Sequence, residues 1–408
     1  MTKVVVVGAG PAGMACAYRL RQQDVDVQVV EARARVGGRT WSETLANGAI
    51  AERGGEYFDS SSTEVHQFVA ELGLHMVSQG YNASVRPTID PSGPSLDELE
   101  DGAALLCDYW KSLGEVDDSV SVADVIAGSP LPPEIKTVTA ARLSSGRAAD
   151  VSRVSARWAD GGSEMPRVSH ELNTRIGEGN QRLAERMMEE IGGERVSRRW
   201  PVATLEREGR GYVLTNYLGA TLSADIVVLA VPATLAPDLA DAVADVRTIA
   251  ALRKVGFGQA TKLHLTLEND VSPAVKQEVA TPFSTWATAG IGSEYAAFVT
   301  GFGATHETQD KLRVMHGPDT FRPLLEAQWP DAKFGPSALL TYWGGDPWTR
   351  GAYSYRPVGW TEEDQDYISR PSERLFFAGE HTTDLHGSSI CGALRSGVRA
   401  AGEVLAQL

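Results

Sequence analysis

The chain begins with a run of valines that leads directly into a glycine-rich turn. Val4 to Val7 are followed by Gly8-Ala9-Gly10-Pro11-Ala12-Gly13. A continuous apolar run of this length is typical of a strand that is buried on both faces of a parallel sheet. We therefore predict a strand, a tight turn and a helix over 14–22, with backbone N–H groups at the helix start facing the pyrophosphate of a nucleotide.

A second apolar run, over 25–30, ends at Glu31. A carboxylate at this distance from the glycine turn can accept hydrogen bonds from both ribose hydroxyls of a dinucleotide. A nicotinamide dehydrogenase and a flavoprotein both fit these two features, so a further motif has to separate them.

The motif Arg35-Val36-Gly37-Gly38-Arg39-Thr40 comes so soon after Glu31 that no crossover helix fits between them. The glycine pair allows the backbone to approach a ligand closely. Arg39 can contact a phosphate or the edge of a flavin ring. A plain nicotinamide dehydrogenase does not need this pair, so the motif favours a flavoprotein.

The C-terminal part carries another strand, glycine and helix start. The apolar run 375–378 is followed by Gly379-Glu380-His381-Thr382, and a helix is predicted from near Ile390. This order again places backbone N–H groups where cofactor oxygens can lie. His381 has no second ligand at metal spacing, so we predict no metal and expect the imidazole to form hydrogen bonds around the cofactor.

Together with 52–56 and 343–359, these motifs resemble the flavin-containing amine oxidase family, which includes monoamine oxidases, polyamine oxidases, L-amino-acid oxidases and flavin-dependent histone demethylases. The resemblance covers nearly the whole chain in order and is weakest over 77–176. It implies an α/β fold (α+β overall), with a discontinuous Rossmann-like FAD-binding domain and a second, mixed sheet-and-helix substrate domain. The expected FAD-binding domain comprises 1–76, 177–245 and 360–408, and the substrate domain comprises 77–176 and 246–359.

The motifs and the resemblance assign one set of residues to the cofactor. In the resemblance, Val202 matches an adenine contact and Trp343 a residue close to the flavin ring. The full set is Gly8, Gly10, Pro11, Ala12, Gly13, Glu31, Ala32, Arg33, Gly38, Arg39, Thr40, Gly54, Gly55, Glu56, Val202, Trp343, Gly379, Glu380, Ser389 and Ile390.

Lys262 is the first catalytic candidate. It lies in the predicted strand 259–267, whose alternation puts Leu263 and Leu265 on one face and Lys262 and His264 on the other. The pattern alone fits a solvent-exposed lysine equally well. The resemblance implies that Lys262 holds a water near flavin N5, whereas His264 looks like an ordinary residue of the polar face.

The second catalytic candidate is Tyr353, in the aromatic segment 343–355. Its aromatic residues alternate with glycines and a proline, which predicts a loop that exposes aromatic faces. Such faces suit an amine site because they offer apolar contact and attract a cation weakly. Ordinary aromatic packing is the alternative on pattern alone. The resemblance places Tyr353 beside the flavin on the substrate side.

Two positions depart from monoamine oxidases. Ala352 stands where these enzymes carry the cysteine that links the flavin, so the resemblance implies non-covalent FAD. Ser389 stands where they carry a second tyrosine of the aromatic cage, which predicts a wider pocket. Trp158 and Trp286 are candidates for the missing aromatic wall.

Composition limits the partners and the setting. The net charge of -15 disfavours nucleic acid or an anionic membrane surface as the main partner. Cys16, Cys107 and Cys391 show neither disulfide nor metal spacing, and no signal peptide or membrane span is apparent. We therefore expect a soluble, cytoplasmic, two-domain enzyme, with an oligomeric state that the sequence does not reveal.

The predicted activity is that of an FAD-dependent oxidoreductase acting on a small-molecule amine. Hydride transfer from the carbon next to the nitrogen leaves an imine that water hydrolyses, and O2 reoxidises the flavin to give H2O2. One alternative is an L-amino-acid or cyclic-amine oxidase. The amino-acid reading needs a cation for the carboxylate, and the candidates are Arg142, Arg147, Arg153 and Arg157. A flavin-fold binding protein with little turnover is the second alternative.

Overall fold

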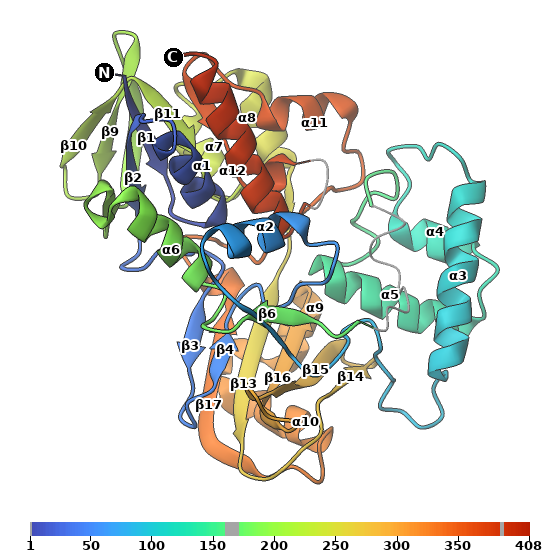
Figure 1. The fold of residues 1–408 in the computed structure, drawn as a ribbon. Helices are drawn as coiled ribbons and strands as arrows, with labels where there is room; N and C mark the ends of the chain where they lie inside the picture. Colours follow the sequence, from blue (N-terminus) through green and yellow to red (C-terminus); the bar gives the residue numbers. More distant parts are fainter. Residues whose placement is uncertain (1, 160–170, 384–386) are drawn as a thin grey trace.

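The computed structural model describes residues 2–159, 171–383 and 387–408 (Figure 1). Residues 160–170, which belong to the expected substrate domain, lie outside the described residues. Within the described ranges the chain forms two large sheets, several short strand pairs and a group of helices.

A five-stranded parallel sheet organises the nucleotide-binding part, in the order β19, β11, β1, β2, β7. Its strands come from three separate stretches of the chain, in agreement with a discontinuous domain. They are β1 (Lys3–Val7), β2 (Asp26–Glu31), β7 (Val196–Arg198), β11 (Ile226–Leu229) and β19 (Leu375–Phe377). Val4 to Val6 are fully buried because both faces of the sheet are covered, which explains the unbroken apolar run.

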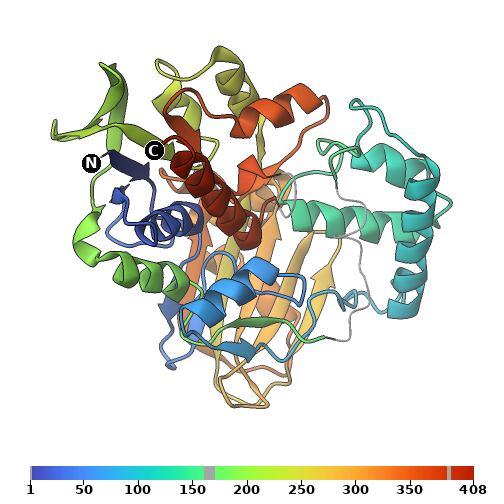
Figure 2. The ribbon, with the colours of Figure 1, turned by 45° about the horizontal axis from the view of Figure 1, so that its top comes forward.

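Helices from both ends of the chain cover one face of this sheet (Figures 1 and 2). They are α1 (Pro11–Arg21), α2 (Thr63–Glu71), α6 (Arg182–Ile191) and α12 (Ile390–Leu405). Helices α1 and α12 lie side by side, and a Cβ atom at Gly397 would lie 2.2 Å from the Ala12 carbonyl oxygen. This close approach of two backbones brings the C-terminal motif next to the N-terminal glycine turn.

The opposite face of the parallel sheet is covered by a small antiparallel sheet and three helices. These elements are β8 (Val202–Glu208), β9 (Gly211–Asn216), β10 (Thr221–Ala224), α7 (Ala236–Ala240), α8 (Val246–Lys254) and α11 (Glu362–Ser369). Helix α8 buries Ile249 and Leu252 in the same core as Trp360 and Phe377. The expected domain boundary at residue 246 divides this packing unit, and we propose to place it after Lys254.

A five-stranded antiparallel sheet forms the second part of the molecule, in the order β14, β15, β16, β13, β17. Its strands are β13 (Ala260–Leu267), β14 (Ala274–Glu278), β15 (Phe283–Ala289), β16 (Ala296–Ala304) and β17 (Phe334–Tyr342). Leu263 and Leu265 pack with residues of α9 (His306–Leu312) and α10 (Arg322–Ala327). The alternation predicted for β13 therefore directs Lys262 to the other face.

Three helices and several short elements complete the structure. Helices α3 (Leu96–Ser112) and α4 (Val122–Gly128) begin at the capping boxes of Ser95 and Ser121, and α5 (Pro133–Arg147) begins with a proline at its first position. The short strand pairs are β3 (Ser42–Thr44) with β4 (Ile50–Glu52), β5 (Met76–Ser78) with β6 (Thr174–Ile176), and β12 (Gly256–Phe257) with β18 (Ser354–Tyr355). The 3-10 helices are η1 (Gly193–Arg195), η2 (Val314–His316), η3 (Pro318–Thr320), η4 (Trp343–Gly345) and η5 (Glu380–Thr382).

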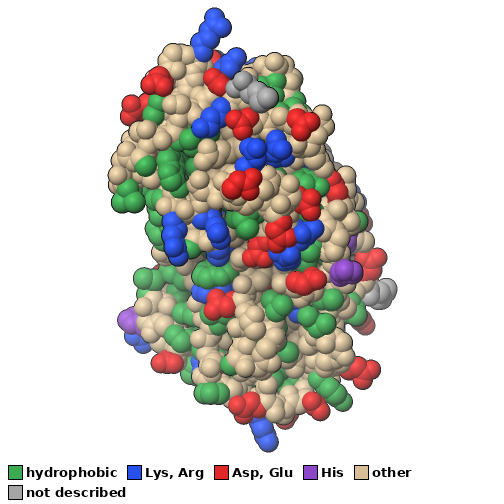
Figure 3. Space-filling view, turned by 60° about the vertical axis from the view of Figure 1, so that its left-hand side comes forward, with side chains coloured by type: hydrophobic (Ala, Val, Ile, Leu, Met, Phe, Trp, Pro, Cys, Tyr) green, Lys and Arg blue, Asp and Glu red, His purple; other side chains and the backbone are tan. Residues whose placement is uncertain are grey.

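The surface carries charges of both signs. On the face shown in Figure 3, acidic and basic side chains are interspersed with apolar ones. On this face the negative net charge is not gathered into one patch. Among the described residues, no helix has both the length and the apolar character that crossing a membrane requires.

Candidate functional site

A cavity of about 730 Å³ runs between the parallel sheet, the C-terminal motif and the antiparallel sheet. Every residue that the sequence assigns to the cofactor or to catalysis lines this cavity, with the exception of Gly13. A Cβ atom at Gly13 would lie 2.0 Å from the Gly8 carbonyl oxygen, so Gly13 serves the close packing of α1 on the turn. The structure thus brings both ends of the chain and Lys262 to one site.

The glycine turn forms one end of the cavity. Gly8 has a φ of +104°, and a Cβ atom there would lie 2.7 Å from the Ala230 carbonyl oxygen, so only glycine fits. Gly10 instead faces Gly38, and a Cβ atom on Gly10 would meet only the Gly38 Cα, at 3.9 Å. Because Gly10 and Gly38 both line the cavity, they form a cradle whose missing side chains leave room for a ligand.

Glu31 holds this turn in place at the end of β2. Its carboxylate accepts hydrogen bonds from the backbone N–H groups of Ala9 and Arg33, both at 2.8 Å. Each carboxylate oxygen can accept more than one hydrogen bond. Glu31 can therefore organise the turn and still accept the ribose hydroxyls of a dinucleotide.

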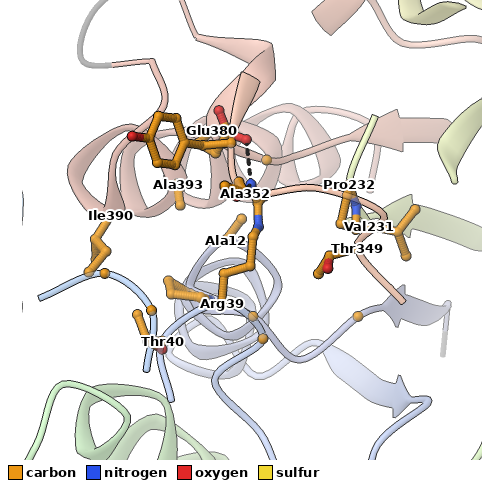
Figure 4. A pocket seen from close by; sticks show the side chains of 18 of the residues that line it. Ala12, Arg39, Thr40, Val231, Pro232, Thr349, Ala352, Glu380, Ile390 and Ala393 are labelled. Carbon is orange, nitrogen blue, oxygen red and sulfur yellow. Dashed lines mark hydrogen bonds and ion pairs between the residues drawn. The ribbon is translucent and has the colours of Figure 1, made fainter. Parts of the chain in front are cut away.

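Arg39 joins the two glycine-rich ends of the chain (Figure 4). Its Nη1 atom donates to Glu380 Oε1 and to the Ala352 carbonyl oxygen, both at 2.8 Å. Burial raises the pKa of the Glu380 carboxyl, but the charge of Arg39 and the hydrogen bond from Ser354 outweigh it and hold this pKa below its usual value. Glu380 is therefore a buried, ionised carboxylate, and the ion pair fixes the C-terminal motif beside Arg39.

Lys262 lies at the other end of the cavity and is almost fully buried. Its ammonium group donates to the carbonyl oxygens of Glu52 at 3.1 Å and Gly54 at 2.8 Å, and to Glu56 Oε2. A lysine ammonium has three N–H donors, and each of them has an oxygen acceptor here. The charge is compensated within the protein by the buried carboxylate of Glu56.

Glu56 connects Lys262 to the core of the second sheet. The indole Nε1 of Trp286 donates to Glu56 Oε1 at 2.8 Å. Lys262 Nζ lies 5.5 Å from the centroid of the Trp286 ring. The sequence motif around Glu56 predicted a cofactor contact, and the structure in addition places its side chain in a buried network with Lys262 and Trp286.

Two aromatic side chains line the cavity near Lys262. Tyr353 donates its hydroxyl to the Gly146 carbonyl oxygen at 3.0 Å, at the C-terminal end of α5. Phe302 lies directly opposite Lys262 in the β13–β16 register and also lines the cavity. The sequence did not single out Phe302, because this pairing of two distant strands cannot be read from local pattern.

The two tryptophans considered for the second wall do not line the cavity. Trp158 donates its indole N–H to the Trp360 carbonyl oxygen at 2.8 Å, near α11. Trp286 lies behind Phe302, with ring centroids 6.0 Å apart. Phe302, with Trp286 behind it, therefore contributes an aromatic surface to the cavity. Ser389 caps α12 by accepting the Gly392 backbone N–H at 3.0 Å, which explains a small hydroxyl residue there.

The aromatic segment 343–355 divides between two parts of the cavity. Trp343 is buried and donates its indole N–H to the Arg53 carbonyl oxygen at 2.9 Å. Trp348 lies instead against Tyr217, with ring centroids 6.4 Å apart, and both line the cavity beside Val202. The segment therefore contributes aromatic side chains to more than one part of the cavity.

Among the histidines that the structure describes, His264 and His381 are buried. Burial, with a further contribution from the charge of Lys262, lowers the pKa of His264 well below its usual value, and its Nδ1 lies 2.9 Å from Thr300 Oγ1. Burial also lowers the pKa of His381 to about 4. Neither histidine lines the cavity, so the expected hydrogen bonding of His381 around the cofactor is not found.

Comparison with known proteins identifies the family. A profile of the family described as flavin containing amine oxidoreductase matches residues 145–405, and a profile of the NAD(P)-binding Rossmann-like domain matches residues 6–72. The first match covers more than half of the chain, so the protein belongs to the flavin-containing amine oxidoreductase family. Its cofactor is a flavin, and the dinucleotide-binding fold makes it FAD.

The chain is also similar to individual members over nearly its full length. It is 27% identical to putrescine oxidase of Kocuria rosea, with 98% of this chain and 95% of that protein aligned. It is 25% identical to human lysine-specific histone demethylase 2, with 99% of this chain but 53% of that protein aligned. The chain thus spans about half the length of the histone demethylases that it matches.

Solved structures show the same fold. The likeness to a redesigned putrescine oxidase has a TM-score of 0.85 at 21% identity and covers 100% of this chain and 99% of that one. The likeness to cyclohexylamine oxidase from Brevibacterium oxydans has a TM-score of 0.83 at 21% identity, with the same coverage. At these identities the solved structures show the fold alone, and the family match is what places the chain among the flavin-containing amine oxidoreductases.

Proposed function

We propose that the protein oxidises a small primary or secondary amine, with FAD as the electron acceptor and O2 as the final oxidant. One continuous cavity carries this proposal, because it runs from the glycine cradle of Gly10 and Gly38 to Lys262, Phe302 and Tyr353. Bound FAD supplies the acceptor for a hydride from the carbon next to the amine nitrogen. Hydrolysis of the resulting imine and formation of H2O2 complete the proposed reaction.

Each part of the cavity has a proposed role in holding FAD. Gly8 to Ala12 and the start of α1 face the pyrophosphate, and Glu31 accepts the ribose hydroxyls. Val202, Tyr217 and Trp348 surround the adenine. Arg39 and the C-terminal motif follow the cofactor toward its ring, with Trp343 close to the ring.

Non-covalent binding of the flavin is supported by the residue at position 352. Ala352 lines the cavity and has no nucleophilic group that could form a bond to the ring. Cys391 also lines the cavity, but burial raises the pKa of its thiol, which disfavours the reactive thiolate.

The substrate end suits an uncharged amine. A protonated nitrogen has no lone pair to stabilise the cation that develops as the hydride leaves. Phe302 and Tyr353 provide apolar contact, and a poorly hydrated site disfavours the charged form.

An amino-acid substrate has less support. None of Arg142, Arg147, Arg153 and Arg157 is among the described residues that line the cavity. The arginines that do line it are each paired with an acid: Arg33 with Asp346, Arg39 with Glu380 and Arg350 with Asp238. A substrate carboxylate would therefore have to share one of these arginines with its acid.

A substrate panel tests the proposal. The panel contains a short diamine, a cyclic primary amine and several neutral L-amino acids. The two amines correspond to the substrates for which the similar putrescine oxidase and cyclohexylamine oxidase are named. We expect the purified yellow protein to produce H2O2 with at least one amine and with none of the amino acids. Production of H2O2 from the amino acids alone would favour the alternative.

A further inference from the structure

Glu56 occupies an unusual position, because it belongs both to the cavity wall and to the network around Lys262. Its side chain is 2% exposed, yet it lines the cavity together with Phe302 and Tyr353. Both of its oxygens have a protein donor, Lys262 on Oε2 and Trp286 on Oε1. A buried carboxylate with two such partners is ionised and fixed in place.

Lys262 has no donor left for a ligand in this arrangement. Its three N–H groups point to the oxygens of Glu52, Gly54 and Glu56. The Glu56 oxygens, in contrast, each retain acceptor capacity beyond the one bond that they make. Of this pair, the group with unused hydrogen-bonding capacity is therefore the acceptor Glu56, and the group that it would bind is a hydrogen-bond donor such as an N–H.

The surroundings keep the carboxylate from moving toward or away from a ligand. The Trp286 ring packs between Tyr81 and Phe302, with centroid distances of 6.5 Å and 6.0 Å. Lys262 is held by two backbone carbonyl groups in addition to Glu56. Because both partners of the carboxylate are anchored in the core, its position is preorganised, which is the condition under which a charge stabilises a transition state.

We propose that Glu56 accepts a hydrogen bond from the N–H group of the substrate amine and thereby orients the nitrogen in front of the flavin. This proposal rests on the amine oxidase activity proposed above. It makes Glu56 a catalytic residue and defines the substrate class as primary and secondary amines. A neutral tertiary amine has no N–H to offer.

The charge of Glu56 also matches the electron flow. The C–H bond next to the nitrogen breaks, and the hydride carries both electrons to the flavin, which is reduced. The nitrogen lone pair forms the C=N bond, so the substrate becomes an iminium cation. The neutral amine carries no net charge, whereas positive charge develops on the nitrogen as the hydride leaves. A fixed carboxylate beside the N–H therefore stabilises the transition state more than the ground state.

The first experiment compares Glu56→Gln with the wild type on two amines that differ by one methyl group. These are an N-methyl amine and its N,N-dimethyl analogue, and the measurement is the rate of flavin reduction without oxygen. We expect the substitution to slow reduction by the secondary amine about 100-fold, as is typical for loss of one preorganised electrostatic contact. We expect reduction by the tertiary amine to be slow in the wild type and to change less than about threefold in the variant.

The comparison separates hydrogen bonding from size. If the tertiary amine reduces the flavin slowly because it is too large, the ratio of the secondary-amine rate to the tertiary-amine rate stays the same in the variant, and the proposal is overturned. If this ratio falls toward one because the secondary amine slows, the proposal is supported. Glu71→Gln is the matched control, since Glu71 on α2 pairs with Arg19 on α1 and does not line the cavity. We expect this control to reduce its flavin at the wild-type rate.

A binding measurement gives a readout that does not depend on turnover. tert-Butylamine has N–H groups but no hydrogen on the carbon next to the nitrogen, so it can bind without being oxidised. We expect its Kd, measured from the change in the flavin spectrum, to rise about tenfold in Glu56→Gln, the effect of losing one hydrogen bond. An unchanged Kd would overturn the proposal.

Failure of this inference is distinct from failure of the proposed function. If amines reduce the wild-type flavin and Glu56→Gln behaves like the wild type, only the role of Glu56 is wrong. If no amine reduces the wild-type flavin, both proposals are wrong. If Glu56→Gln does not fold, the wild-type protein still tests the role of Glu56. Rapid reduction of its flavin by the tertiary amine would overturn the proposal, because this amine has no N–H group to donate.

Discussion

Arg39 and Glu380 form an ion pair at 2.8 Å although 341 residues separate them in the sequence. The pair lies where the two glycine-rich ends of the chain meet, and its carboxylate side chain is only 5% exposed. Ser354 and the backbone N–H of Ser388 also donate to Glu380. One buried carboxylate therefore joins three segments that line the cavity.

Removing the charge of Glu380 should loosen this junction. We expect Glu380→Gln to lower the free energy of unfolding by about 2 kcal/mol, because Arg39 loses its buried partner while part of the hydrogen bonding remains. The control is Asp241→Asn in the exposed pair of Asp241 with Arg253, for which we expect less than about 0.5 kcal/mol. Urea titrations measure both changes, and equal effects would contradict the structural role of the pair.

Gly10 offers a test of the cofactor site that does not disturb the fold. A methyl group on Gly10 meets no protein atom closer than 3.9 Å, but it points into the cradle that Gly38 completes. We expect Gly10→Ala to weaken FAD binding at least tenfold, about 1.4 kcal/mol, while the unfolding of the FAD-free protein is nearly unchanged. Gly402→Ala, at a position with no neighbouring atom within 4 Å, is the matched control and should retain FAD.

Tyr353 should act through its ring more than through its hydroxyl. The hydroxyl donates to a backbone carbonyl of α5, away from the expected position of the amine. We expect Tyr353→Phe to change KM for an apolar amine less than about threefold and Tyr353→Ala to raise it at least tenfold, since a buried ring face contributes about 1.5 kcal/mol or more. Steady-state kinetics measure both, and a larger effect of the phenylalanine variant would show that the hydroxyl matters more.

Glu52 gives the stability a defined pH dependence. Burial raises the pKa of its carboxyl from 4.5 to about 7, even though Asn180 and Ser42 donate hydrogen bonds to it. Between pH 4.5 and about pH 7, Glu52 is protonated in the folded protein but ionised in the unfolded chain. The free energy of unfolding therefore falls as the pH rises through this range, by up to about 3 kcal/mol. Glu52→Gln removes the effect, and its advantage over the wild type should therefore grow from pH 5 to pH 8.

Unfolding free energies of the two proteins at several pH values check this prediction. The sign is the reverse of that for an ordinary salt-bridged carboxylate, which adds stability as the pH rises. A difference between the variant and the wild type that stays constant from pH 5 to pH 8 would show that the Glu52 carboxyl is not perturbed.

Much of the nucleotide-binding part could be predicted because its signals are local. The valine run, the turn from Gly8 to Gly13 and Glu31 are contiguous in sequence and adjacent in space. The alternation in β13 correctly placed Leu263 on the core face and Lys262 on the opposite face, which lines the cavity in the structure. These features depend on strand period and turn geometry, which a short stretch of sequence contains.

The substrate end could be predicted only in part because it depends on pairing between distant strands. Phe302 lies opposite Lys262 through the β13–β16 register, and no local pattern specifies that register. Trp348 contacts Tyr217, which belongs to a distant segment, and no local pattern predicts this pair. Likewise, all three N–H donors of Lys262 are used by Glu52, Gly54 and Glu56, and these contacts form only because the fold brings β13 beside 52–56.

The central claim is that an amine delivers its electrons to a flavin in this cavity. The most direct measurement mixes the purified protein with amines in the absence of oxygen and follows the visible flavin absorption. We predict that at least one primary or secondary amine bleaches the flavin and that admission of air restores the colour with release of H2O2. A flavin that remains oxidised with every amine, while a chemical reductant bleaches it, would contradict the account.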